Sequence, residues 1–427
     1  MAASSPTHTA DQLRQFYDEL PYPNAPYSLS PSEAEGGYGE AFKVSLMVAQ
    51  YARTRQIVET EGAVLLNAGC GSGWETLLLA EANPGAKIIG VDLSPTSVKI
   101  AEQRLRYHGY LNTEFYALDL LDLEQLGIQF DFISCNDVIY LLDSPLAALQ
   151  VFGKILKPDG ILRTNLHNLY TRREKLEMQE AFGLLGQYQI SRFEAAGNVK
   201  LFMESLIPDN PRRKAWDPAF YRDNTIIMNN YLLEHDKGFS IPETFNLLRQ
   251  AGLDMVSLVD APSWQIESLF NQVPEFVQQS LANLSLADQL HLYELTAPNH
   301  RLIDFWAEQR GSSFILPWAD DDWLNGSVQL NPVLIQNKPF HQRFKEAVEK
   351  KLDFTINWGY SNRGVLTIPA DKLPWLHLLL NGSIPVQTLI EKAAQLNSLA
   401  LPEATDQVLA YLSALEEFLF VLLEPSL

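Results

Sequence analysis

The sequence predicts an α/β protein with a doubly wound, mostly parallel sheet, and three observations support this fold class. Short apolar runs of strand length recur between residues 60–165, with helical patterns between them. A glycine-rich turn at residues 69–73 joins the first run to the first helical pattern. Asp92 and Asp119 follow the second and third runs, at the carboxyl edge where open parallel sheets bind their ligands.

The first strand and the loop after it are expected to form a ligand site. Residues 64–68 are almost entirely apolar or small, which predicts a buried parallel strand. Gly69, Gly71 and Gly73 then allow a sharp turn and a close approach of the backbone to a ligand. The helical pattern at residues 74–80 follows directly, and the unpaired amides at its start favour an electron-rich group.

The remaining elements of this sheet follow in order. Further strands are expected at residues 87–91, 113–117, 130–135, 160–164 and 254–259. Helices are expected at residues 11–20, 41–60, 172–185 and 241–253, the last closed by Gly252. Asp92 stands just beyond the second strand, where a carboxylate is placed to accept both hydroxyls of a ribose.

Five stretches in this region resemble, in order and spacing, the motifs of class I S-adenosylmethionine-dependent methyltransferases. They are residues 67–73, 90–94, 117–120, 130–133 and 156–160. The resemblance implies a Rossmann-like, seven-stranded sheet with S-adenosyl-L-methionine as the cofactor. It also implies transfer of a methyl group to an acceptor, which the sequence does not identify as a small molecule or a protein side chain.

The resemblance also implies which residues hold the cofactor. The glycine loop would approach the methionyl part, Asp92 the ribose, and Asp119 with Leu120 the adenine. Asn67 departs from the family, whose members usually have an acid there that helps to hold the amino group. The candidate cofactor-binding residues are Tyr17, Tyr22, Asn67, Ala68, Gly69, Cys70, Gly71, Gly73, Asp92, Leu93, Asp119, Leu120 and Asn136.

Three residues are candidates for catalysis. His167 follows the fifth strand at the carboxyl edge, so it is the best single candidate for a proton acceptor, although a histidine at a strand end is more often a structural residue. Asp137 and Tyr140 follow the fourth strand and, with Asn136, are placed to face the reacting methyl group. Methyl transfer is a one-step in-line displacement, so positioning and exclusion of water can supply most of the rate.

Two other functions remain open. A protein that binds S-adenosylmethionine without catalysis could act as a regulatory or partner-binding module through residues 330–427. A nicotinamide-dependent reductase is the other, but its fingerprint requires a glycine where Trp74 stands. Binding of S-adenosylmethionine against NADH separates the reductase from the rest, and turnover with an acceptor separates the enzyme from the binding protein.

The N-terminal arm has an unusual composition. Pro21, Pro23 and Pro26 favour an extended path, and tyrosines give it aromatic surface. Residues 17–22 resemble the opening of bacterial methyltransferases that carry a downstream regulatory domain, some of which modify protein lysines. We expect residues 14–38 either to fold over the cofactor as a lid, with Tyr17 or Tyr22 in contact, or to form a static strap. Glycines 36, 37 and 39 are expected to form a hinge.

The rest of the chain predicts further domains. The expected boundaries are residues 1–40 for the arm, 41–262 for the methyltransferase domain with an insert at about 171–240, 263–330 for a helical segment and 331–427 for a C-terminal domain. In the last, a hairpin is expected at residues 354–368 with its turn at 361–364, followed by helices at 375–382, 384–396 and 406–423. This pattern resembles small winged-helix modules, and a dimerisation domain that forms a homodimer fits equally well.

Composition restricts the partners. Thirty-two basic and 52 acidic residues give a formal charge of −20, which disfavours nucleic acid and fits a small molecule or a basic protein. The two cysteines, Cys70 and Cys135, are expected to be buried, reduced thiols, which indicates the cytoplasm. No apolar run has the length of a membrane span. Residues 320–322 lack the spaced ligands of a calcium loop, so they predict an exposed turn and no metal site.

Overall fold

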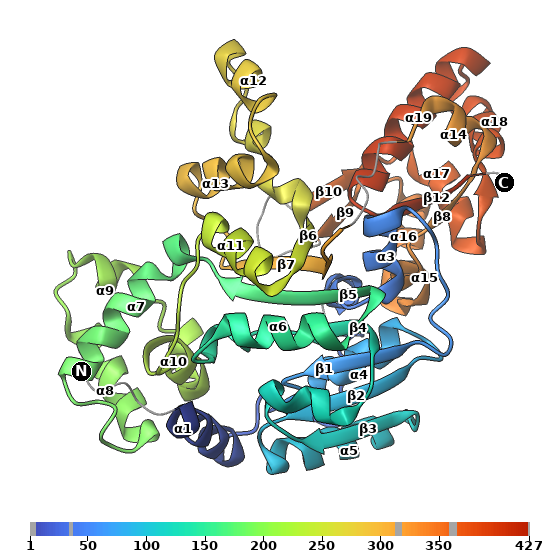
Figure 1. Cartoon of the computed structure of the whole chain (residues 1–427). Helices are drawn as coiled ribbons and strands as arrows, with labels where there is room; N and C mark the ends of the chain where they lie inside the picture. Colours follow the sequence, from blue (N-terminus) through green and yellow to red (C-terminus); the bar gives the residue numbers. More distant parts are fainter. Residues whose placement is uncertain (1–5, 34–36, 312–317, 358–364, 426–427) are drawn as a thin grey trace.

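A computed structural model describes residues 6–33, 37–311, 318–357 and 365–425 (Figure 1). Its centre is a seven-stranded sheet with the order β3-β2-β1-β4-β5-β7-β6. The strands are β1 (Val64–Ala68), β2 (Lys87–Asp92), β3 (Thr113–Ala117), β4 (Phe130–Cys135), β5 (Leu156–His167), β6 (Leu253–Leu258) and β7 (Leu302–Gln309). Strands β1 to β5 run parallel, and β7 is antiparallel to both of its neighbours. The predicted fold class is confirmed.

Helices cover both faces of this sheet. Alternate residues of one strand enter two separate cores, as Leu65 and Leu66 of β1 do. One core includes residues of α3 (Leu46–Thr54), α4 (Trp74–Ala82) and α5 (Pro95–Tyr107), and the other includes α6 (Pro145–Ile155) and α11 (Ile241–Ala251). As predicted, α11 ends at Gly252 in the left-handed conformation.

The N-terminal segment differs from the prediction in two places. Helix α1 (Pro6–Glu19) leads into an extended arm, but the single helix expected at residues 41–60 is two helices, α2 (Gly37–Lys43) and α3. The break occurs because the Ser45 side chain accepts a hydrogen bond from the Val48 amide and so starts α3 as its N-cap. The expected hinge is helical at positions 37 and 39, and position 36 lies outside the described residues.

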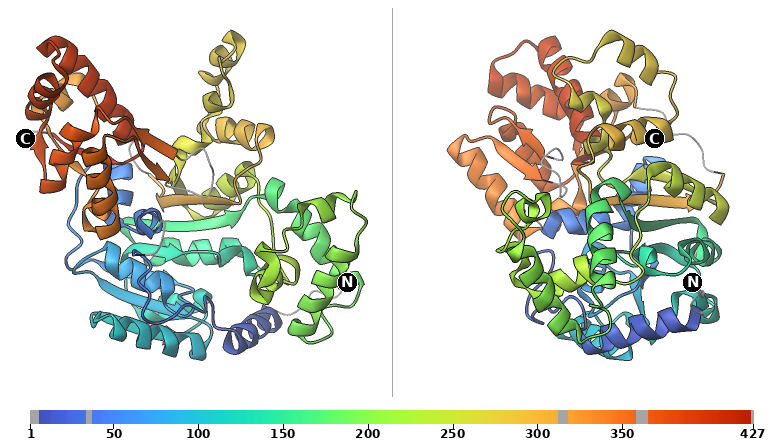
Figure 2. Two further views of the ribbon diagram at one scale, coloured as in Figure 1. Left: turned by 180° about the vertical axis from the view of Figure 1, so that it is seen from behind. Right: turned by 90° about the vertical axis from the view of Figure 1, so that its left-hand side faces the viewer.

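The insert after β5 is a small helical unit with a core of its own. It contains α7 (Leu169–Leu184), α8 (Arg192–Ser205), α9 (Pro211–Ala215), the 3₁₀ helix η3 (Phe220–Arg222) and α10 (Asn224–Tyr231). Phe16 of α1 is buried in the same core. The arm and the insert therefore meet at the carboxyl edge of the sheet, where β5 ends (Figures 1 and 2).

Residues 263–330 do not form a purely helical segment. Helices α12 (Glu275–Leu281) and α13 (Leu286–Thr296) occur there, but so do β7 and β8 (Ser327–Leu330). Strand β7 completes the central sheet, which therefore extends beyond the predicted boundary at residue 262. The predicted turn at residues 320–322 instead opens α14 (Asp320–Asn325), because the Asp322 carboxylate accepts a hydrogen bond from the Ala319 amide.

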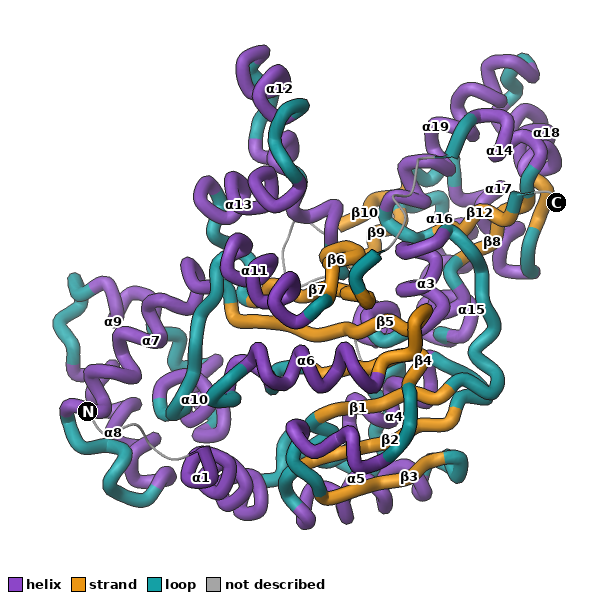
Figure 3. Tube along the Cα trace, viewed as in Figure 1, coloured by secondary structure: helices purple, strands orange, loops and turns teal. Residues whose placement is uncertain are grey.

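The C-terminal unit lies at the end of the sheet opposite the insert (Figures 1 and 3). It has a three-stranded antiparallel sheet of β11 (Ile384–Pro385), β8 and β12 (Val421–Glu424). The predicted hairpin forms between β9 (Phe354–Asn357) and β10 (Val365–Ile368), and its turn lies outside the described residues. The helices are α15 (Pro332–Gln336), α16 (Lys338–Lys350), α17 (Leu373–Leu376), α18 (Val386–Asn397) and α19 (Leu401–Glu417).

Three predicted helices in this unit end or begin elsewhere. The stretch 375–382 divides between α17 and a 3₁₀ helix, η6 (His377–Asn381), and Ile384 belongs to β11. The helix predicted at residues 406–423 ends at Glu417. The chain then turns at Leu419, which has a positive φ of 52°, and continues as β12. Within the described ranges, no helix is both long and apolar enough to cross a membrane.

Candidate active site

The glycine loop is packed closely against the N-terminal arm. Gly71 and Gly73 have positive φ values of 49° and 82°, in the left-handed region that favours glycine. A Cβ at Gly71 would collide with the carbonyl oxygen of Tyr22, and one at Gly73 would lie 2.6 Å from Cα of Ala101. The loop therefore needs glycine for contacts within the chain, with the arm on one side and α5 on the other.

Asp92 fixes the loop from the end of β2. Its Oδ2 accepts a hydrogen bond of 2.9 Å from the Gly71 amide, and its Oδ1 accepts one of 2.9 Å from the Ser94 amide. Burial raises the pKa of this carboxyl group, while the amides of Ser94 and Gly71 oppose the shift. A carboxylate has about four lone-pair sites, so these two bonds leave capacity for further donors.

The other cofactor candidates near this edge have internal partners. Oδ1 of Asp119 accepts a hydrogen bond of 2.9 Å from the Leu121 amide and so caps the 3₁₀ helix η1 (Leu120–Leu126), in which Leu120 is buried. Cys70 and Cys135, the latter at the end of β4, are both buried free thiols. The prediction that the two cysteines are buried and reduced is confirmed.

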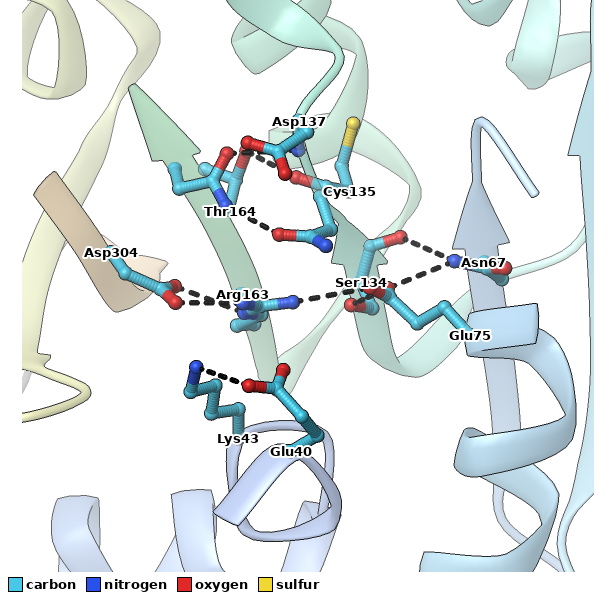
Figure 4. Close-up of polar contacts among 12 residues, drawn as sticks. Glu40, Lys43, Asn67, Glu75, Ser134, Cys135, Asp137, Arg163, Thr164 and Asp304 are labelled. Carbon is cyan, nitrogen blue, oxygen red and sulfur yellow. Dashed lines mark hydrogen bonds and ion pairs between the residues drawn. The ribbon is translucent and has the colours of Figure 1, made fainter. Parts of the chain in front are cut away.

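A row of polar side chains crosses the sheet beside Asn67 (Figure 4). Nδ2 of Asn67 and Oγ of Ser134 donate to Oε1 of Glu75, at 3.1 and 2.6 Å. Arg163 contacts Oε2 of Glu75 at 3.4 Å and donates two hydrogen bonds, of 3.0 and 2.7 Å, to Asp304. An acid thus lies beside position 67 after all, but it comes from the first turn of α4 and is paired with a buried cation.

The arm brings both candidate tyrosines to this edge. Burial raises the pKa of the Tyr17 phenol, and the nearby carboxylates of Asp92 and Asp137 add to the shift. Tyr22 is half-exposed, and its pKa is raised by partial burial and by Asp137. The carbonyl oxygen of Tyr22 accepts a hydrogen bond of 3.0 Å from the Ser72 amide. Tyr17 therefore lies near Asp92 and Asp137, and Tyr22 lies beside the glycine loop and near Asp137.

The three candidate catalytic residues form one cluster. The Tyr140 hydroxyl donates to Oδ1 of Asp137 at 3.1 Å, and its ring stacks on His167 with 3.8 Å between centroids. The Asp137 backbone has a positive φ of 56°, and its amide donates to Oδ1 of Asn165 at 2.9 Å. Nδ2 of Asn165 in turn donates to Oδ1 of Asn136 at 2.5 Å. Asn136 thus joins the cluster through Asn165.

His167 is held by an acid that sequence analysis missed. Its Nδ1 lies 2.8 Å from Oδ1 of Asp236, and Oδ2 of the same carboxylate accepts hydrogen bonds from Arg172 and Gln179. Burial lowers the pKa of His167 below its ordinary value of about 6.5, so the ring is neutral at pH 7. A neutral ring bonded to a carboxylate carries its proton on Nδ1, which leaves the lone pair on Nε2.

Arg301 is the second residue that sequence analysis missed. Its Nη2 lies 3.3 Å from Oδ2 of Asp137, and its Nη1 lies 3.5 Å from Nε2 of His167. Burial opposes ionisation of Asp137, but the charge of Arg301 and the hydrogen bonds from Arg301 and Tyr140 favour the carboxylate, and the pKa of the carboxyl group is lowered. Arg301 directly precedes β7. Because β7 is antiparallel, its amino end lies at the carboxyl edge of β5.

A comparison with known proteins identifies one domain of this chain. A family model described as a methyltransferase domain matches residues 59–195, which span the glycine loop, the Asp137 cluster and His167. These residues form a class I S-adenosylmethionine-dependent methyltransferase domain. S-adenosylmethionine is the cofactor of this domain.

Similarity to particular proteins extends further than this domain. An uncharacterized protein of Synechococcus sp. is 26% identical over 328 residues, which are 75% of this chain and 77% of the relative. A malonyl-[acyl-carrier protein] O-methyltransferase of Acetivibrio thermocellus is 30% identical over 128 residues, but these cover only 28% of this chain and 44% of the relative. The structure of PKMT2 from Rickettsia typhi in complex with AdoHcy has the same fold, with a TM-score of 0.65 and 16% identity over 91% of this chain and 76% of that one.

Proposed function

We propose that this methyltransferase transfers the methyl group to a hydroxyl or amine acceptor bound against Asp137, Tyr140 and His167. The observation that carries the proposal is the state of His167, a buried neutral imidazole whose Nδ1 is held by Asp236. An acceptor hydroxyl or amine must lose a proton when it is methylated, and Nε2 of His167 is the base that takes it once the acceptor replaces the 3.5 Å contact between Nε2 and Arg301.

The residues at the carboxyl edge fit the cofactor. Asp92 presents a buried carboxylate with lone pairs to spare beside the glycine loop, which suits the two hydroxyls of a ribose. Tyr17 and Tyr22 would cover the cofactor from the arm, between Asp92 and Asp137. When bound, the cofactor supplies an electrophilic methyl group on a sulfonium sulfur.

The side chains around His167 support a role in proton transfer. Asp236 fixes the ring orientation and stabilises the imidazolium that forms when Nε2 is protonated. The negative charge of Asp137 acts in the same direction, and the Tyr140 ring holds the imidazole in place by stacking. Arg301 pairs with Asp137 and keeps that carboxyl group ionised.

The acceptor is a small molecule or a protein side chain, and similar proteins carry different names. One relative is named a malonyl-[acyl-carrier protein] O-methyltransferase, and others are named ubiquinone biosynthesis O-methyltransferases. The formal charge of −20 disfavours an acidic polymer and suits a neutral small molecule or a basic protein. The test therefore looks for methylation of small molecules and of proteins separately.

The test supplies labelled S-adenosylmethionine and lysate of the host, which is then divided into protein and small-molecule fractions. We expect label in one fraction with the wild type, and a rate lower by about a hundredfold with His167→Gln, the size of a lost general base. Binding of S-adenosylhomocysteine should be unchanged in His167→Gln, and His377→Gln, in the C-terminal unit, is the matched control. Wild-type rates in His167→Gln would contradict the proposal, and no label in either fraction would favour a non-catalytic binding protein.

A further inference from the structure

Arg104 of α5 is a buried cation placed between the glycine loop and the N-terminal arm. Only 1% of its surface is exposed. Each of its three guanidinium nitrogens donates to a backbone carbonyl: Nε to Ser72 at 3.0 Å, Nη1 to Pro26 at 3.0 Å and Nη2 to Ala25 at 2.8 Å. One side chain thus links the loop to two successive residues of the arm.

Aromatic rings and the loop itself complete this attachment. The Arg104 guanidinium lies 5.1 Å from the centroid of the Tyr27 ring and 5.8 Å from that of Trp74, within the range of a cation–π contact. Ser72 holds the arm from the other side, since its amide donates to the Tyr22 carbonyl and its hydroxyl to the Pro23 carbonyl at 2.6 Å. Residues 22–27 are therefore held against the glycine loop, with the Tyr22 carbonyl directly over Gly71.

The arm has a second, independent attachment near the C-terminal unit. The Ser30 hydroxyl donates to Glu81 of α4 at 2.7 Å, and the side-chain amide of Asn337 donates to the Ser32 carbonyl at 2.6 Å. These contacts do not involve Arg104. Loss of the Arg104 contacts would therefore free the carbonyls of Ala25 and Pro26 and loosen the arm over the loop. Ser72 would still hold Tyr22 and Pro23, Tyr27 would keep its contacts with α5, and the arm would stay anchored further along the chain.

We propose that Arg104 is a positioning residue that sets the affinity for the cofactor by holding residues 22–27 over the glycine loop. The inference rests on the proposed place of the cofactor beside Asp92 and Tyr17. If only the closed arm binds well, the apparent Kd equals the intrinsic Kd divided by the closed fraction. A closed fraction that falls to about one tenth would raise the Kd about tenfold.

Lysine cannot replace the three-way contact. Its single ammonium is a compact point charge, whereas the planar guanidinium presents a fork of donors that reaches several carbonyl groups together. Arg104→Lys keeps the charge and much of the side-chain length, so it tests the geometry of the contact with little risk to folding. We therefore expect the order of cofactor affinity to be wild type, then Arg104→Lys, then Arg104→Ala.

The experiment measures the Kd for S-adenosylhomocysteine by calorimetry, together with protease cleavage of the arm and the melting temperature. Arg106→Ala is the matched control, because Arg106 lies on the same helix, is exposed and pairs with Glu102. We expect Arg104→Ala to bind about tenfold more weakly and to be cleaved faster within residues 20–28. The KM for S-adenosylmethionine should rise, while kcat at saturating cofactor stays close to that of the wild type.

Two results would overturn the inference. Cleavage of the arm at the wild-type rate in both Arg104 variants would show that Arg104 does not hold it. Faster cleavage with an unchanged Kd would show that the arm does not set cofactor affinity. If Asp92→Ala loses binding while both Arg104 variants keep it, the cofactor site stands and only the role of Arg104 is refuted.

Discussion

Asp92 offers the sharpest test of where the cofactor binds. Its carboxylate accepts hydrogen bonds from the Gly71 and Ser94 amides, and we propose that it also accepts the two ribose hydroxyls. A hydrogen bond to a charged group contributes about 1.5–3 kcal/mol, so the loss of two costs at least about 3 kcal/mol. Since every 1.4 kcal/mol is about tenfold in Kd, Asp92→Ala should weaken binding roughly a hundredfold.

Calorimetry with S-adenosylhomocysteine measures this directly. Asp122→Ala is the matched control, because Asp122 is an exposed acid on the neighbouring 3₁₀ helix η1 and its removal changes the net charge equally. Unfolding in urea confirms that the variant still folds, since the glycine loop also loses an acceptor for the Gly71 amide. An Asp92→Ala protein that binds with wild-type affinity would refute the assignment.

Three further predictions follow from the packing and charges of the site. Gly71→Ala should expose the arm to protease and weaken binding of S-adenosylhomocysteine, because the new Cβ collides with the Tyr22 carbonyl. The control Gly109→Ala is also at positive φ but in open space, so it should lower stability by only about 1–2 kcal/mol through backbone strain. Arg163→Met leaves buried carboxylates unpaired and should lower the free energy of unfolding in urea by about 3–5 kcal/mol. The control Lys154→Met, which removes an exposed ion pair, should lower the same free energy by less than about 1 kcal/mol. Because burial lowers the pKa of His167, the unfolded chain binds a proton that the folded protein does not, so wild-type stability should fall as the pH drops from about 7 to about 5.5. The His167→Gln variant should show a flatter pH dependence in chemical unfolding, and equal slopes would show that His167 is not buried neutral.

The central sheet could be predicted because buried parallel strands leave uniform apolar runs bounded by turns. Element ends were harder to predict. Ser45 interrupts an otherwise continuous helical pattern only because its side chain caps α3. The apolar run of β12 fits a helix as well as a strand, and its pairing with β8 decides between them.

The candidate site was predictable only where a motif follows a strand. Asp92, Asp137 and His167 each lie at or just after a recognisable strand end, so the sequence places them at one edge. Asp236 comes from a helical insert, and only tertiary packing brings it to His167. Arg301 could have been found from the antiparallel direction of β7, but nothing in the sequence marks the residue before that strand as functional.

The most direct test of the proposed cofactor and acceptor sites is a crystal structure with S-adenosylhomocysteine bound. We predict ribose hydroxyls on the Asp92 carboxylate, Tyr17 or Tyr22 in contact with the ligand, and the sulfur facing the Asp137 and Tyr140 side chains. A ligand bound away from the glycine loop, or a sulfur directed away from Asp137 and His167, would contradict this prediction.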